Sequence, residues 1–217
     1  GEDFLMERLE TNIAVLTGEV TGELILSHKT YGETFYQLEL SIDRRSGYRD
    51  AINIMISDRL LFDKTLNKGD MLHINGQVRT YNTAVNGKNR LNVVVFAREL
   101  EVLEDIEYYQ NEIYLEGYIC KPPIKRTSPL GREICDIMLA VNRMYNKSDY
   151  IPCIAWGRNA SYAATMEVGE KICIEGRIQS RQYNKKDSEG NVTVHTAYEV
   201  SVIKIDEAEQ ADKDEII

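Results

Sequence analysis

An internal duplication restricts this chain to two copies of one fold. Residues 12–18 (NIAVLTG) match residues 111–117 (NEIYLEG), and residues 69–76 (GDMLHING) match residues 169–176 (GEKICIEG). A repeat of this length is too long for a solenoid and is typical of a duplicated domain. We expect a first domain at residues 10–105 and a second at 110–205.

Each copy has the pattern of a small all-β barrel. Apolar residues alternate along short segments that end at Gly, Asn and Asp, which predicts half-buried strands separated by turns. Residues 58–67 and 158–167 instead favour a short helix between the third and fourth strands. Five strands with one helix at this place are the arrangement of the OB-fold, a Greek-key barrel. Residues 82–89 and 184–192 are expected to be hairpin loops.

The charge is unevenly distributed along the 217 residues. Residues 1–110 carry 12 basic and 18 acidic side chains, whereas residues 111–205 carry 13 basic and 11 acidic ones, so only the second copy has a net positive charge. Residues 206–217 are acidic and poor in large apolar side chains, which predicts a disordered tail. No apolar run is long enough for a membrane span, and the four cysteines lack metal-binding or disulfide spacing. We expect a soluble cytoplasmic protein with reduced cysteines.

The sequence contains no recognisable catalytic motif. His28, His73 and His195 are scattered, no glycine-rich phosphate loop is present, and no nucleophile has a base near it in sequence. We therefore expect neither enzymatic activity nor a metal or other cofactor.

The second copy interleaves aromatic and basic residues, the combination that binds single-stranded nucleic acid. Bases stack on aromatic rings while cations follow the phosphates, and neither contact requires a particular base. The candidate residues are Tyr145, Tyr150, Trp156, Tyr183, Lys125, Arg126, Arg143, Lys147, Arg158, Arg177, Arg181, Lys185 and Lys186. Trp156 also fits a core position, because it ends the apolar run 154–156.

Residues 111–205 resemble the bacterial single-stranded DNA-binding protein (SSB) family. The resemblance rests on residues 111–117, PIKR at 123–126, LAVNR at 139–143, AWGRNA at 155–160, and the EGR segment at 175–177. It implies base stacking on Tyr145, Tyr150, Trp156 and Tyr183 and a DNA contact by Arg126. It also implies a nucleoid-associated bacterial protein of replication, recombination and repair, and a homodimer that provides four OB-folds.

The family's acidic tail implies binding to DNA-processing proteins. Here Asp214, Glu215, Ile216 and Ile217 are similar in kind but lack the family's Pro-Phe ending.

The first copy departs from this pattern and leaves other interpretations open. Ala51 and Ser57 stand where the second copy has Tyr150 and Trp156. We expect weaker DNA binding there, by Arg44, Arg45, Tyr48, Arg49, Arg79 and Tyr81. The alternatives are a non-catalytic protein-interaction module, similar to a primosome adaptor, and a subunit of a nucleic-acid enzyme.

Overall fold

The structure is a computed structural model that describes residues 10–105 and 108–208. By its internal contacts this part of the chain divides into two compact units. The first unit contains residues 14–105, 108–111 and 178–199, and the second contains residues 10–13, 112–177 and 200–208. The duplication assigns residues 178–199 to the second repeat, but their contacts make them part of the first unit. No helix in the described ranges is long and apolar enough to cross a membrane.

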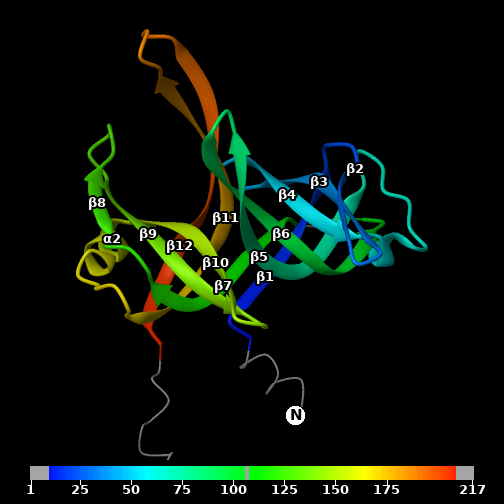
Figure 1. The fold of residues 1–217 in the computed structure, drawn as a ribbon, viewed down its shortest axis with the longest axis horizontal. Coiled ribbons are helices and arrows are strands. Elements are labelled where there is room, and N and C mark those ends of the chain that lie inside the picture. Colours follow the sequence, from blue (N-terminus) through cyan, green and yellow to red (C-terminus); the bar gives the residue numbers. More distant parts are fainter. Residues whose placement is uncertain (1–9, 106–107, 209–217) are drawn as a thin grey trace, which may run out of the picture. The chain divides into compact units, whose positions relative to one another are not determined.

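The first repeat is a closed barrel of mostly antiparallel strands (Figure 1). Its elements are β1 (Asn12–Val20), β2 (Ile25–Thr30), β3 (Glu33–Asp43), β4 (Arg49–Ser57), the 3₁₀ helix η1 (Asp58–Leu61), β5 (Met71–Val85) and β6 (Lys88–Leu103). The strands lie in the order β2-β3-β4-β6-β5-β1, and pairing of β1 with β3 closes the barrel.

The second repeat has the same order of elements (Figure 1). These are β7 (Gln110–Ile119), β8 (Ile124–Thr127), β9 (Glu133–Arg143), β10 (Lys147–Trp156), α2 (Gly157–Ala163), β11 (Lys171–Lys186) and β12 (Val192–Glu207). The strand order is β7-β11-β12-β10-β9-β8, and β7 also pairs with β9. Two OB-fold barrels in tandem confirm the predicted fold class.

Four details differ from the expectations. A short edge strand, β2 or β8, is added to the five barrel strands of each repeat. The helix expected at 58–67 is only the 3₁₀ helix η1. The expected loop at 82–89 is mostly strand, with a turn at 86–87, whereas the expected loop at 184–192 is present but shortened to residues 187–191. Finally, Asp206 and Glu207 continue β12 rather than beginning a tail.

Alternation along the strands separates a core face from an outer face. In β4, Ile52, Ile54 and Ile56 are fully buried in the barrel. In β10, the buried residues Ile151, Cys153 and Ala155 have the same role. Successive side chains of a strand point to opposite faces, so the residues between them lie on the other face of the sheet. There Asn53 and Pro152 are partly exposed, whereas Met55 and Ile154 are buried as well.

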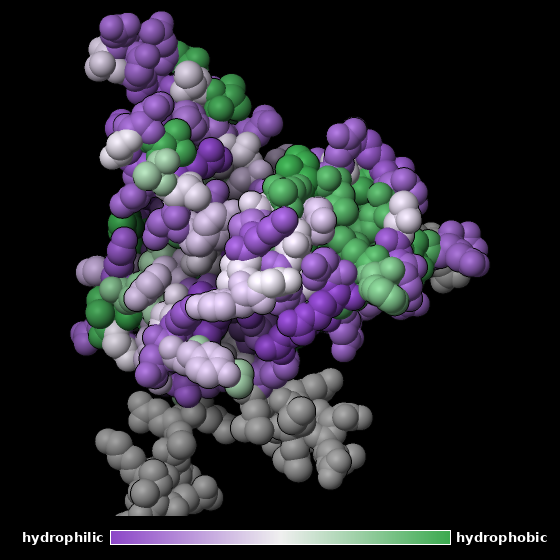
Figure 2. All heavy atoms as spheres, turned by 45° about the vertical axis from the view of Figure 1, so that its right-hand side comes forward, coloured by the Kyte–Doolittle hydropathy of each residue, from purple (hydrophilic) through white to green (hydrophobic). Residues whose placement is uncertain are grey.

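The outer surface of the first unit carries hydrophobic side chains. Figure 2 shows them gathered on the face drawn there. On the edge strand β2, Ile25 is 64% exposed and Leu26 is 56% exposed, and Phe62 after η1 is 93% exposed. This surface is therefore less polar than the acidic composition of the first repeat suggests.

A pair of matching glycines, one in each repeat, allows neighbouring strands to approach closely: β5 and β6 in the first repeat, and β11 and β12 in the second. A methyl group on Gly176 would collide with the carbonyl oxygen of Ser201, and one on Gly76 would collide with the carbonyl oxygen of Phe96. Glycine is needed at both places because it has no Cβ. The two repeats thus bring Ser201 and Phe96 to equivalent positions.

Candidate nucleic-acid interface

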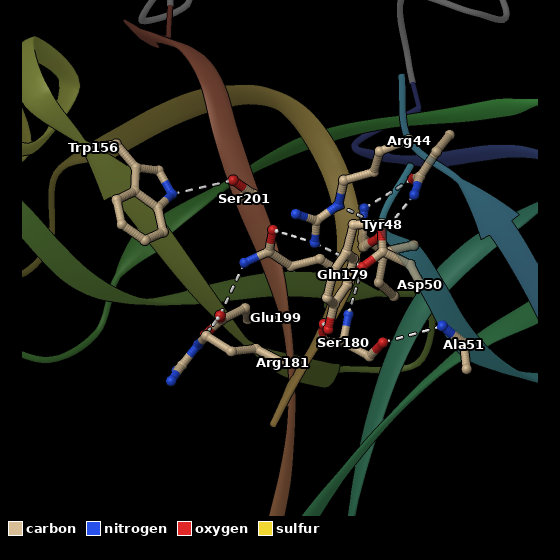
Figure 3. A network of polar contacts seen from close by, with 12 residues as sticks. Arg44, Tyr48, Asp50, Ala51, Trp156, Gln179, Ser180, Arg181, Glu199 and Ser201 are labelled. Atoms are coloured by element: carbon tan, nitrogen blue, oxygen red, sulfur yellow. Dashed lines mark hydrogen bonds and ion pairs between the residues drawn. The ribbon is translucent and has the colours of Figure 1, made fainter. Parts of the chain in front are cut away.

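Trp156 ends β10 on the outer face of the second barrel. Gly157 follows it with φ +57°, a left-handed conformation that glycine adopts at little cost, and this turns the chain directly into α2. The indole Nε1 donates a hydrogen bond of 3.3 Å to Ser201 Oγ on β12 (Figure 3). The guanidinium of Arg132 lies 4.7 Å from the ring centroid. The ring is partly exposed, so Trp156 is not an ordinary core residue.

Tyr150 lies on the same face of β10 as Trp156. The two residues are six positions apart, and the side chains between them on this face belong to Pro152 and Ile154. Tyr150 is 51% exposed and pairs across the sheet with Ala140, a small residue. The outer face of β10 therefore presents an accessible aromatic ring at each of its two ends, with the fully buried Ile154 between them.

Tyr145 is held on a tight turn between β9 and β10. Tyr145 has φ +65° and the next residue, Asn146, has φ +57°. Two consecutive left-handed residues are typical of a type I′ hairpin turn, which favours Asn and Gly and disfavours Tyr. The ring is 90% exposed, so burial of the ring does not offset the strain.

Three of the predicted cations of the second unit already have carboxylate partners. Arg126 Nε lies 2.6 Å from Asp136, Lys125 Nζ lies 3.3 Å from Glu133, and Arg143 Nε lies 2.9 Å from the fully buried Asp149. Hydrogen bonds from the Ser161 hydroxyl and from Lys125 lower the pKa of Glu133 below its ordinary value. These cations need to exchange or share a partner to contact a phosphate.

Two other predicted cations of this unit are more available. Lys147, at the start of β10, and Arg158, in α2, are exposed. Neither forms an ion pair with any residue in the described ranges. Arg177, near the middle of β11, is only partly exposed. Lys147 and Arg158 are therefore the better candidates for phosphate contacts.

The outer part of the β11–β12 hairpin carries the remaining predicted residues. Tyr183 is 40% exposed, and its ring stacks on His195 with 5.7 Å between centroids. Arg181 Nε lies 3.0 Å from Glu199, which is 8% exposed. Lys185 and Lys186 are exposed near the hairpin tip. The structure groups these residues with the first unit.

In the first unit, two of the residues predicted to bind DNA weakly form a polar network (Figure 3). Arg44 binds both oxygens of Asp50 at 2.7 Å and also donates to Gln179 Oε1. Asp50 is fully buried and also accepts from the Ser180 N–H. The ring of Tyr48 lies under the Arg44 guanidinium, and its hydroxyl donates to the Ser180 carbonyl. Asp50 raises the pKa of Arg44, so Arg44 is a charged but neutralised residue.

The other four predicted residues of the first repeat lie in different surroundings. Arg49 pairs with Asp43 at 2.6 Å and with Glu19 at 2.8 Å, whereas Arg45 is exposed without an ion pair among the described residues. Arg79 lies 4.1 Å over the ring of Phe96, and Tyr81 is 39% exposed on β5.

Several contacts of this surface were not predicted from the sequence. No sequence pattern marks Ser201, the hydrogen-bond partner of Trp156, as part of the site. His28, Phe35 and Phe96 form a chain of ring contacts in the first unit. Only the strand register brings these three rings together. Alternation along β3 places Phe35 on the outer face, which is the one sequence signal that could have found it.

The structure offers nothing for metal chemistry where it is described. Among residues 10–105 and 108–208, no group of three His, Cys, Asp or Glu side chains is arranged to hold a metal ion. The four cysteines are free. The predicted tail residues Asp214, Glu215, Ile216 and Ile217 lie outside the described residues.

Comparison with known proteins relates the second repeat to a family. Residues 110–206 match the model of the single-strand binding protein family. The single-stranded DNA-binding protein of Clostridium tetani is 38% identical over 84 residues, which cover 36% of this chain and 58% of that protein. Single-stranded DNA-binding protein A of Bacillus subtilis is 30% identical over 86 residues, covering 36% of this chain and 50% of that protein. The chain thus spans only 50–58% of the length of these relatives.

A solved structure matches nearly the whole chain. The crystal structure of the wild-type single-stranded DNA binding protein from Thermus aquaticus has a TM-score of 0.72 and 19% identity, and covers 92% of this chain and 94% of that chain. At this identity the likeness concerns the fold, which is the tandem arrangement of two OB-fold barrels.

Proposed function

Because residues 110–206 match the model of the single-strand binding protein family, we propose that this chain binds single-stranded DNA without sequence preference. The observation that carries the proposal is the partly exposed indole of Trp156 on the outer face of β10, next to a cation and in line with Tyr150. The named relatives are binding proteins, and the chain is not an enzyme.

The side chains of the second unit support a stacking mechanism. Tyr145, Tyr150 and Trp156 provide ring faces, and stacking on a ring is open to every base. Lys147 and Arg158 supply positive charge for the phosphates, which sequence-independent binding requires. Base-edge hydrogen bonding is not needed for this mode of binding, and affinities for different unstructured sequences are expected to be similar.

The wider role follows from the same proposal. The chain coats and protects transiently unwound DNA in replication, recombination and repair. Two chains form a homodimer and thereby provide four OB-folds. The protein acts in the cytoplasm, associated with the bacterial nucleoid. Its acidic C-terminal residues dock DNA-processing proteins.

Titration with oligo(dT) tests the proposal through the single tryptophan of the chain. Stacking of a base on Trp156 is expected to quench its emission strongly, whereas a duplex of the same length is expected to bind much more weakly. Unchanged emission at saturating oligo(dT), or a preference for duplex, contradicts the proposal. An absence of oligo(dT) binding favours the protein-interaction module instead.

A further inference from the structure

The two repeats exchange an aromatic and a serine between equivalent positions. In the second repeat, Trp156 on β10 donates to Ser201 on β12. In the first repeat, the residue that matches Trp156 is Ser57. On β6, the fifth barrel strand of the first repeat, Phe96 is the cross-strand partner of Met55 on β4. In the second repeat, Ser201 on β12 is in the same way the partner of Ile154 on β10. The first repeat therefore keeps one aromatic at this place, but on β6 rather than β4.

The serine at position 57 has a structural task that explains the exchange. Ser57 Oγ accepts a hydrogen bond of 3.3 Å from the Arg59 N–H and caps η1. It also donates to Glu33, whose carboxylate lies 3.1 Å from the Arg59 guanidinium. Serine is a preferred helix-capping residue and tryptophan is not. The aromatic of the first repeat consequently comes from another strand.

Phe96 belongs to a row of rings from three strands. Its centroid lies 5.8 Å from that of Phe35 on β3, at an interplanar angle of 44°. Phe35 in turn stacks on His28 of β2, with centroids 4.8 Å apart and an angle of 13°. Arg79 is on β5, and its guanidinium lies 4.1 Å from the centroid of the Phe96 ring. We call these four side chains the aromatic row.

The aromatic row lies outside the core. Phe35 alternates with the buried Leu38 and Leu40 and so faces outward, and Phe96 follows the buried Val95 on the opposite face. Phe35 and Phe96 are partly exposed, and His28 is exposed. Hydrophobic side chains also gather on the surface of this unit in Figure 2. Rings in this position are accessible to a flat ligand.

We propose that the aromatic row is a second base-stacking surface, with single-stranded nucleic acid as its ligand. The bases stack on Phe35 and Phe96, while Arg79, whose guanidinium lies over the Phe96 ring, supplies positive charge for the phosphates. Aromatic rings beside cations are the combination that single-stranded nucleic acid requires. The inference rests on the proposed function, but it assigns to the first repeat a binding surface that shares only Arg79 with the six weakly binding residues expected from its sequence.

Moving the only tryptophan into the aromatic row tests this surface directly. The double variant Phe96→Trp with Trp156→Phe keeps an aromatic ring at both positions and makes residue 96 the only fluorescent indole. The probe is oligo(dT) of about 40 nucleotides, longer than two OB-fold sites of about 4–16 nucleotides each. We expect quenching of this new tryptophan at saturation. Quenching in the wild-type chain without quenching at position 96 overturns the inference and leaves the proposed function intact, whereas a wild-type chain without binding refutes the proposed function.

Alanine variants provide an independent measurement. Phe35→Ala and Phe96→Ala are each expected to weaken binding of the same oligo(dT) about 5- to 150-fold, the range for loss of one stacked base. Phe62→Ala is the matched control, because it removes the same side chain from an exposed position of the same unit, and is expected to leave affinity unchanged. Phe96→Tyr retains a ring and is expected to retain affinity. Equal affinities for the Phe35, Phe96 and Phe62 variants, at wild-type thermal stability, overturn the inference.

Discussion

Removal of the Asp50 carboxylate is expected to destabilise the first unit. Asp50 has no exposed surface and accepts two hydrogen bonds of 2.7 Å from Arg44 and one of 3.1 Å from the Ser180 N–H. The substitution Asp50→Ala leaves a guanidinium and a buried backbone N–H without this acceptor. Both groups then lose hydrogen bonds that water cannot fully replace.

The size of the effect follows from the burial of the two partners. Loss of one partner from a buried ion pair costs about 3–5 kcal/mol. Arg44 is 23% exposed, so water can solvate part of its charge. We therefore expect Asp50→Ala to lower the free energy of unfolding by about 2–4 kcal/mol. Asp50→Asn keeps one acceptor and is expected to cost about 1–2 kcal/mol.

Urea unfolding followed by far-UV circular dichroism measures this difference. Asp43→Ala is the matched control, because Asp43 also pairs with an arginine, Arg49, at 2.6 Å, but both side chains are at least 35% exposed. An exposed pair contributes about 0–1 kcal/mol. If Asp50→Ala and Asp43→Ala shift the midpoint equally at unchanged m value, burial does not determine the strength of the Arg44–Asp50 pair and the reasoning is wrong.

Three further outcomes are expected. Tyr145→Ala is expected to weaken oligo(dT) binding by about 1–3 kcal/mol without lowering the melting temperature, because the ring is 90% exposed; equal affinity by fluorescence anisotropy would exclude stacking there. Gly176→Ala is expected to destabilise the protein by about 1–3 kcal/mol in thermal unfolding, since the new methyl group collides with the Ser201 carbonyl, and an unchanged melting temperature would refute the predicted collision. Arg49 lowers the pKa of Asp43, and Ser161 and Lys125 lower the pKa of Glu133. The two ionised carboxylates therefore stabilise the fold above about pH 4, and this stabilisation is lost as the pH falls further. Asp43→Asn is expected to reduce the acid sensitivity of the melting temperature.

The duplication made most of the fold predictable. The matched glycines and the alternation of 35–44 with 134–143 fix the strands and their faces, because both are local properties of the sequence. The short helix of the first repeat was less predictable. Leu60 and Leu61 suit a helix, but the chain forms only the single 3₁₀ turn η1, since capping by Ser57 does not determine how many turns follow.

The exposure of the candidate aromatic residues was predictable, but the ion pairs and ring contacts around them were not. Trp156, Tyr150 and Tyr145 are partly or largely exposed where the resemblance places them. The ion pairs of Arg126 with Asp136 and of Arg181 with Glu199 were not anticipated, because each joins residues on neighbouring strands. The aromatic row escaped notice for the same reason: its members come from β2, β3, β5 and β6.

The grouping of residues 178–199 with the first unit has a consequence for how the chain folds as it is synthesised. The hydrogen bond from the Ser180 N–H to Asp50 spans 130 positions, and contacts of such long range slow folding. At synthesis rates of about 5–20 residues per second, Ser180 is added roughly 6 to 26 seconds after Asp50. During that interval, the buried carboxylate of Asp50 lacks one of its donors. A fragment limited to residues 10–105 would remain in this unfinished state, so the two repeats, although similar in sequence, mature as one translation product.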